Sequence, residues 1–217
     1  MRSKYIGPFF LVFFVLLIDQ LLKFWIKLNM SLGQEFKIFA NWAIIHFTEN
    51  NGMAFGLELG GEAGKLALTL FRIVAACAIG YGMAYLIKNR YHAGLVTSVA
   101  LILAGAIGNI IDSSFYGLIF SESTYFNMAK LVPYGQGYAD LFHGKVVDMF
   151  YFPLFSGVYP DWMPFWAGEE FIFFRPVFNV ADVAISIGVV LILIFQKHYY
   201  REEETVPGFL HDEVIEE

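Results

Sequence analysis

Ionisable side chains stand inside stretches of this sequence that are otherwise almost entirely apolar. Asp19 and Lys23 lie within the run Ile6–Ile26, four residues apart, so in a helix they share one face and can form an ion pair. If this run crosses a membrane outward, Asp19 lies about 10 Å below its outer end at 1.5 Å per residue. A charge in hydrocarbon is costly and is usually retained for function.

Carboxylates and amides recur where two later apolar runs end and begin. Asn109 and Asp112 close one run, Asn179 and Asp182 open another, and the members of each pair are three residues apart. Asp148 precedes an aromatic stretch and can approach the same depth from a loop. These acids are therefore expected to gather in one layer near the outer edge of the membrane.

Two carboxylates held close together can hydrolyse an amide without a metal or a covalent intermediate. One ionised Asp takes a proton from water, while the other, protonated, donates to the carbonyl oxygen. Two like charges in a poor dielectric cannot both ionise, so such a pair shares a proton. Any one of these polar residues can instead have a purely structural role, and we expect that role for Asp19, Lys23 and Asp112.

The sequence lacks the motifs of other common enzyme chemistries. It has no GxSxG elbow, HExxH motif, P-loop or dinucleotide fingerprint, and its five histidines are scattered. The single Cys77 excludes an internal disulfide, and we expect it to be a small buried apolar residue. No metal and no cofactor are predicted.

The composition places these residues in a membrane protein. Of 217 residues, 58% are hydrophobic and 16% charged. Seven of the 20 acids lie in 202–217, which leaves 13 acids against 14 bases in a near-neutral body and argues against a nucleic-acid partner. We predict one membrane domain over residues 1–201 and an acidic cytoplasmic tail over 202–217.

Four stretches are long and apolar enough to cross a bilayer, which needs about 20 residues. Lys and Arg flank one side of all of them, at positions 2, 4, 88, 90, 197 and 201, so both termini are expected in the cytoplasm. Residues 27–65 and 112–178 then form the extracytoplasmic segments. The predicted spans are Ile6–Ile26, Leu66–Ile87, Ala93–Ile111 and Asn179–Tyr199.

The extracytoplasmic segments differ in character. Glu35–Asn50 is rich in β-branched and aromatic residues without proline, which predicts strands of a small sheet. Asp148–Phe178 is aromatic but carries several acids and the prolines Pro153, Pro160 and Pro164, which argues against a fifth span and favours a loop on the membrane surface. The fold class expected is a mostly α polytopic membrane protein with a small sheet.

Five short motifs together resemble the lipoprotein signal peptidase (signal peptidase II) family. Each motif alone is weak, but all five occur in the family's order on four spans, and the likeness runs from about residue 6 to 200. The motifs are Asp19–Lys23, Asn50–Gly56, Gly105–Asp112, Val146–Phe150 and Phe178–Asp182.

The resemblance implies a multi-pass aspartyl endopeptidase of the bacterial plasma (inner) membrane. Such enzymes cut the signal peptide from a diacylglyceryl-modified prolipoprotein before its lipidated cysteine, so this precursor and membrane lipid are the expected partners of a monomer. Asp148 and Asp182 match the catalytic aspartates of the family. Positions that match residues shaping the site are Asp19, Lys23, Asn50, Gly52, Asn109, Asp112 and Asn179.

The chain departs from the family pattern in two respects. Ser113 stands where the family usually has Arg, so Lys145 or Arg175 is a candidate to hold Asp112 instead. The segments 114–145 and 149–178 are enlarged, and the sequence assigns them no role.

Two other functions are compatible with intramembrane charges. A small proton- or ion-coupled transporter also uses buried Asp and Lys, but it needs a polar path to the cytoplasmic side, and the inner halves of the second and fourth spans carry essentially no ionisable groups. A structural membrane subunit would leave the polar layer unexplained.

Overall fold

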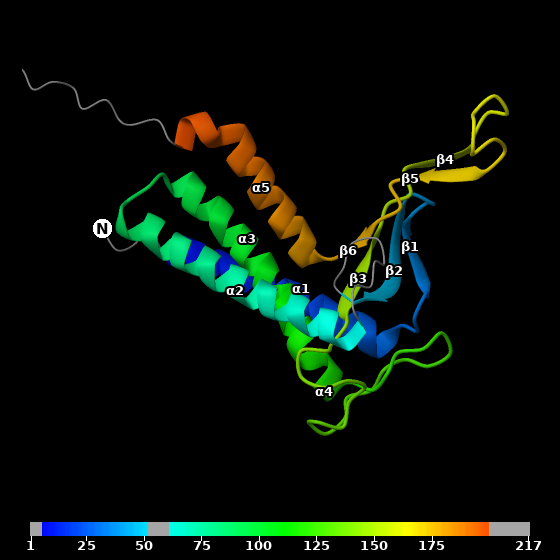
Figure 1. Ribbon diagram of the computed structural model, residues 1–217, viewed down its shortest axis with the longest axis horizontal. Coiled ribbons are helices and arrows are strands. Elements are labelled where there is room, and N and C mark those ends of the chain that lie inside the picture. Colours follow the sequence, from blue (N-terminus) through cyan, green and yellow to red (C-terminus); the bar gives the residue numbers. More distant parts are fainter. Residues whose placement is uncertain (1–5, 52–60, 200–217) are drawn as a thin grey trace, which may run out of the picture.

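The computed structural model describes residues 6–51 and 61–199. Within them, four helices are long and apolar enough to cross a membrane, which confirms the four predicted spans to within a few residues at most of their ends (Figure 1). The beginning of the first helix, the turn between the second and third, and the end of the last lie at one end of the molecule. The helices are α1 (Ile6–Asn29), α2 (Gly61–Lys88), α3 (Ala93–Ile111) and α5 (Val180–Tyr199).

Large apolar side chains cover the outer surface of these helices. Phe9, Phe71 and Leu193 are more than half exposed, as expected of residues that face lipid rather than a protein core. Cys77 is also exposed on α2, so the expectation of a buried cysteine was wrong. The reason is that lipid, unlike water, imposes no cost on an apolar side chain left outside the protein.

Close contact between α3 and α5 depends on two glycines. A Cβ on Gly105 would lie 2.2 Å from the carbonyl oxygen of Ala181, and one on Gly188 would lie 2.5 Å from that of Ser98. Small residues allow membrane helices to approach closely where no hydrophobic force drives them together. This contact brings the end of α3 beside the start of α5, where the predicted polar layer lies.

A four-stranded sheet lies at the end of the helices opposite the α2–α3 turn (Figure 1). The strand order is β1-β2-β3-β6, and every neighbouring pair is antiparallel. The strands predicted within 35–50 are confirmed, whereas the other two come from the segment expected to be a loop. The strands are β1 (Glu35–Phe39), β2 (Ala43–Asn50), β3 (Val146–Tyr151) and β6 (Val177–Phe178).

The enlarged segment between β3 and β6 folds into a second, separate hairpin. Its strands are β4 (Phe155–Val158) and β5 (Glu170–Phe173), which pair only with each other among the described strands. We call residues 154–174 the arm, because they project beyond the sheet and away from the helices (Figure 1). Strand pairing therefore replaces much of the surface loop that the sequence predicted.

The sheet is fixed to the helix ends by one hydrophobic cluster. Its members come from the last turns of α1, from β2 and β3, and from the extension of α3 through the π-helical turn η3 (Asp112–Tyr116) and α4 (Gly117–Ile119). Burial of such side chains contributes about 1.5–3 kcal/mol each. The larger members are Ile26, Met30, Phe47, Tyr116, Phe120, Val147 and Met149.

Candidate active site

Asp148 lies on β3, an inner strand of the sheet, and not in a loop as predicted. Its neighbour across the β2–β3 register is Thr48, and only 2% of the residue is exposed. Both carboxylate oxygens accept hydrogen bonds from amides, one from Asn179 Nδ2 at 2.7 Å and one from Asn50 Nδ2. Burial, and then the charge of Asp182, raises the pKa of Asp148 to about 7.

Asp182 lies in the first turn of α5, which begins one residue after Asn179. The Asn179 side chain accepts a hydrogen bond from the Asp182 N–H at 2.9 Å, and Asp182 accepts one from the Asn179 N–H at 3.2 Å. This reciprocal pair is a capping box, which satisfies two free backbone donors at a helix start. The other Asp182 oxygen accepts a hydrogen bond from Asn109 Nδ2 at 2.8 Å, so the carboxylate is held from two helices.

Lys23 is the cation at the centre of the buried layer. Its Nζ lies 2.9 Å from Asp19, 2.8 Å from Asp112 and 2.9 Å from Asn109 Oδ1, and its exposure is zero. The predicted Asp19–Lys23 ion pair is therefore present, and Asp112 joins it. Three acceptors for three ammonium protons offset much of the cost of burying this charge.

Each acid of this cluster also holds a second element. Asp19 accepts a hydrogen bond at 2.9 Å from the N–H of Ala181, at the start of α5, where a negative charge suits the helix dipole. Asp112 accepts one from the N–H of Val147 on β3 at 3.3 Å and one from Gln20 at 3.0 Å. The cluster thereby positions the two elements that carry the catalytic candidates.

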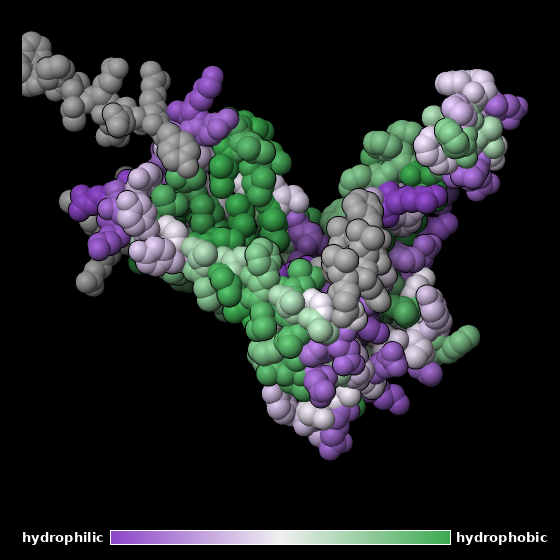
Figure 2. Space-filling view, viewed as in Figure 1, coloured by the Kyte–Doolittle hydropathy of each residue, from purple (hydrophilic) through white to green (hydrophobic). Residues whose placement is uncertain are grey.

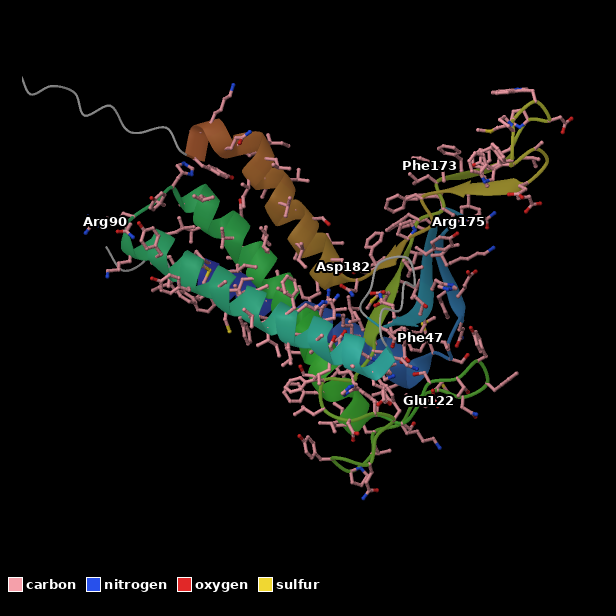
Figure 3. The ribbon with its side chains drawn as sticks, viewed as in Figure 1. Phe47, Arg90, Glu122, Phe173, Arg175 and Asp182 are labelled. Atoms are coloured by element: carbon pink, nitrogen blue, oxygen red, sulfur yellow. The ribbon has the colours of Figure 1, made fainter. Side chains whose placement is uncertain are left out.

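The residues considered as substitutes for the usual arginine do not hold Asp112. Ser113 donates a hydrogen bond to the carbonyl oxygen of Asn109 within its own helix. Lys145 instead lies 3.9 and 3.6 Å from two glutamates, and Arg175 is exposed beside the arm (Figure 3). Lys23 and Gln20, both on α1, bind Asp112 instead.

Sequence reasoning did not single out two further parts of the buried layer. Gln20 donates to both acids of the cluster and accepts a hydrogen bond from the Tyr116 hydroxyl at 3.1 Å. Lys27 is fully buried, pairs with Glu49 on β2, and lies 3.0 Å from Ser123 in the enlarged segment. Lys27 follows Lys23 by one turn, and that spacing is the signal that could have revealed it.

The remaining predicted residue and one further cation complete the surroundings. Gly52 lies outside the described residues. Arg72 is half-buried on α2 and interacts electrostatically with both Asp148 and Asp182. The side chain of Asp182 lies where α5 meets the sheet (Figure 3), beside an open notch between α5 and the arm (Figure 2).

Comparison with known proteins gives a consistent result. The family model described as signal peptidase (SPase) II matches residues 11–197. A lipoprotein signal peptidase of Porphyromonas gingivalis is 55% identical over 185 residues, which are 85% of this chain and 80% of the relative. One of Amoebophilus asiaticus is 41% identical over 180 residues, 82% of this chain and 72% of the relative.

Two solved structures of bacterial membrane enzymes share the fold. One bacterial membrane enzyme aligns with a TM-score of 0.58 at 23% identity, over 93% of this chain and 96% of its own, which shows a shared fold. A second aligns with a TM-score of 0.57 at 26% identity, over 88% and 94%. With four membrane-spanning helices and a family match over most of its length, the chain belongs to the signal peptidase II family of aspartic-type membrane peptidases.

Proposed function

We propose that this protein removes the signal peptide from diacylglyceryl-modified prolipoproteins, cutting before the lipidated cysteine, with Asp148 and Asp182 as its catalytic pair. One observation carries the assignment. A strand and a helix bring the two carboxylates onto the same asparagine, Asn179, where the helices meet the sheet. The relatives named as lipoprotein signal peptidases support the substrate.

The environments of the two acids favour different roles. Because burial raises the pKa of Asp148 to about 7, roughly half of the molecules carry its proton at neutral pH, and this proton can be donated to the scissile carbonyl oxygen. Asp182 then takes a proton from the attacking water, which gives a tetrahedral diol. In the second half, Asp182 passes its proton to the leaving nitrogen, the C–N bond breaks, and Asp148 regains a proton from one hydroxyl.

The remaining site residues fit a positioning role in this proposal. Asn50, Asn109 and Asn179 hold the carboxylates by hydrogen bonds, and the Lys23 cluster fixes the elements behind them. The transporter alternative gains no support, because this polar cluster joins the sheet end of the helices.

For topology we propose one monomeric domain over residues 1–201 of a bacterial plasma membrane protein, with both termini in the cytoplasm. The basic residues Lys88, Arg90 and Lys197 support this orientation, because they lie at the helix ends away from the sheet. The site then opens at the outer leaflet, where a lipidated precursor presents its cysteine.

Cleavage should depend strongly on the lipid of the substrate. Each buried CH₂ contributes about 0.8 kcal/mol, so two acyl chains hold the peptide at the membrane surface far more firmly than the peptide alone. Equal amounts of lipidated and unlipidated precursor in one detergent, followed by gel shift, give the initial rates. We expect the unlipidated precursor to be cut poorly, and equal rates would refute the proposed substrate while leaving the catalytic pair intact.

The rate should fall as the pH rises through about 7. An acid whose pKa is raised keeps its proton below that value and loses it above, so Asp148 stops donating on the alkaline side. The charged groups that face it are Asp182 on α5, Lys23 on α1 and Arg72 on α2. Initial rates between about pH 5 and pH 9 measure this decline, which is the alkaline limb of the pH profile. A rate that did not change with pH would exclude Asp148 as the proton donor.

A charge variant sharpens the pH measurement. Arg72→Gln removes a cation from the pair, which should raise the pKa of Asp148 and move the alkaline limb upward by about one pH unit. Arg90→Gln removes the same kind of charge in the turn between α2 and α3, far from the aspartates (Figure 3). This control should not change the pH at which the rate falls. Identical profiles for both variants would show that Arg72 does not act on the pair.

A further inference from the structure

The arm presents an unusually aromatic face. The β4–β5 register places Phe155 opposite Phe173 and Gly157 opposite Phe171, so these residues share one side of the hairpin. The rings of Phe155 and Phe173 stack at 4.6 Å, and Tyr159 lies 4.8 Å from Phe171. The glycine makes room for this arrangement, because a Cβ there would lie 2.9 Å from the Phe171 ring.

More rings stand at the tip of the arm. Trp162 is 78% exposed and Phe165 is 91% exposed, while Trp166 is half exposed. An isolated two-stranded hairpin is at best marginally stable in water, and a contiguous exposed apolar surface usually marks an interaction site. The arm therefore needs a partner that accepts aromatic rings.

The position of the arm indicates which partner this is. It projects from the sheet across the open notch from α5, whose residues Val190, Leu193 and Ile194 are exposed and belong to an apolar span (Figures 1 and 2). Apolar side chains line the side of the arm turned toward α5, across the open notch (Figure 2). The lipid that surrounds α5 is thus continuous with the space beneath the arm.

The chemistry of the arm limits its depth. Tyr and Trp, which join an apolar ring to a polar group, suit the boundary between acyl chains and headgroups, and the neighbouring Phe rings add apolar area on the same face. The exposed acids Asp161, Glu169 and Glu170 oppose insertion into hydrocarbon and give no attraction to anionic headgroups. We infer that the arm rests on the bilayer surface beside α5, with its aromatic face in the headgroup region.

This inference depends on the membrane-spanning fold and not on the assignment of the catalytic pair. The chain has four tryptophans, of which two lie in the arm. Trp25→Phe with Trp42→Phe leaves only the arm pair, and the converse variant, Trp162→Phe with Trp166→Phe, leaves Trp25 on α1 and Trp42 beside β2. Both full-length variants are reconstituted in phosphatidylcholine vesicles with lipids brominated near the headgroup or near the chain end.

The arm tryptophans should lose more fluorescence to bromine near the headgroup than to bromine near the chain end. The loss should persist in salt of about 1 M, because it depends on apolar contact and not on charge. The converse variant, with Trp25 on a span, confirms that the vesicles report lipid contact. Full quenching of the arm by aqueous iodide without bromolipid quenching would place it in water and overturn the inference. Bromolipid quenching that appears only as the protein is diluted in lipid would assign the aromatic face to a second copy of the chain.

Discussion

Asp148→Asn and Asp182→Asn will each lower the rate of precursor cleavage by about 10² or more, the usual scale for acid–base groups. An amide nearly matches a carboxylate in shape but can neither take a proton from water nor donate one to a carbonyl. Each asparagine keeps one of the two oxygens that accept hydrogen bonds and leaves the ion cluster around Lys23 intact, so both variants should fold. The measurement is the initial rate on lipidated precursor, with thermal unfolding of the same preparations.

Two controls separate chemistry from structure in this experiment. Asp140→Asn makes the same change at an exposed position of the enlarged segment and should leave the rate unchanged. Asp19→Asn removes charge from the buried cluster and should affect thermal unfolding more than the chemical step, because Asp19 pairs with Lys23 and holds the start of α5. Near-wild-type turnover in either catalytic variant would exclude that aspartate from catalysis.

Lys23→Met will destabilise the protein more than most single changes. Methionine fills a similar volume but leaves Asp19 and Asp112 buried without their shared cation. Removing one partner of a buried ion pair costs about 3–5 kcal/mol, and at roughly 2–4 °C per kcal/mol the Tm should fall by about 10 °C. Thermal unfolding in detergent measures the shift.

The matched comparison for Lys23 is Lys130→Met, the same substitution at an exposed lysine. It should leave the Tm nearly unchanged, since surface charges contribute little. Adding Asp112→Asn to Lys23→Met should restore part of the loss, because it removes one of the unpaired buried charges. If Lys23→Met unfolded at the same temperature as Lys130→Met, the cluster would not stabilise the fold.

Much of the scaffold followed from local properties of the sequence. Whether about 20 residues cross a membrane depends on their own hydropathy, so the four spans could be predicted without knowing their neighbours. The Asn179–Asp182 spacing is likewise local, since a capping box forms within one helical turn. The Asp19–Lys23 pair follows from the same helical repeat.

The tertiary structure alone decided where Asp148 lies and what surrounds it. Its strand pairs with residues about a hundred positions earlier, and such non-local pairing leaves little trace in a short aromatic segment. The sequence likewise could not show that Lys23 would bind both acids, that Lys27 would meet Glu49, or that Cys77 would face lipid. Periodicity shows which residues share a helix face, but only the packing of the other elements decides what that face touches.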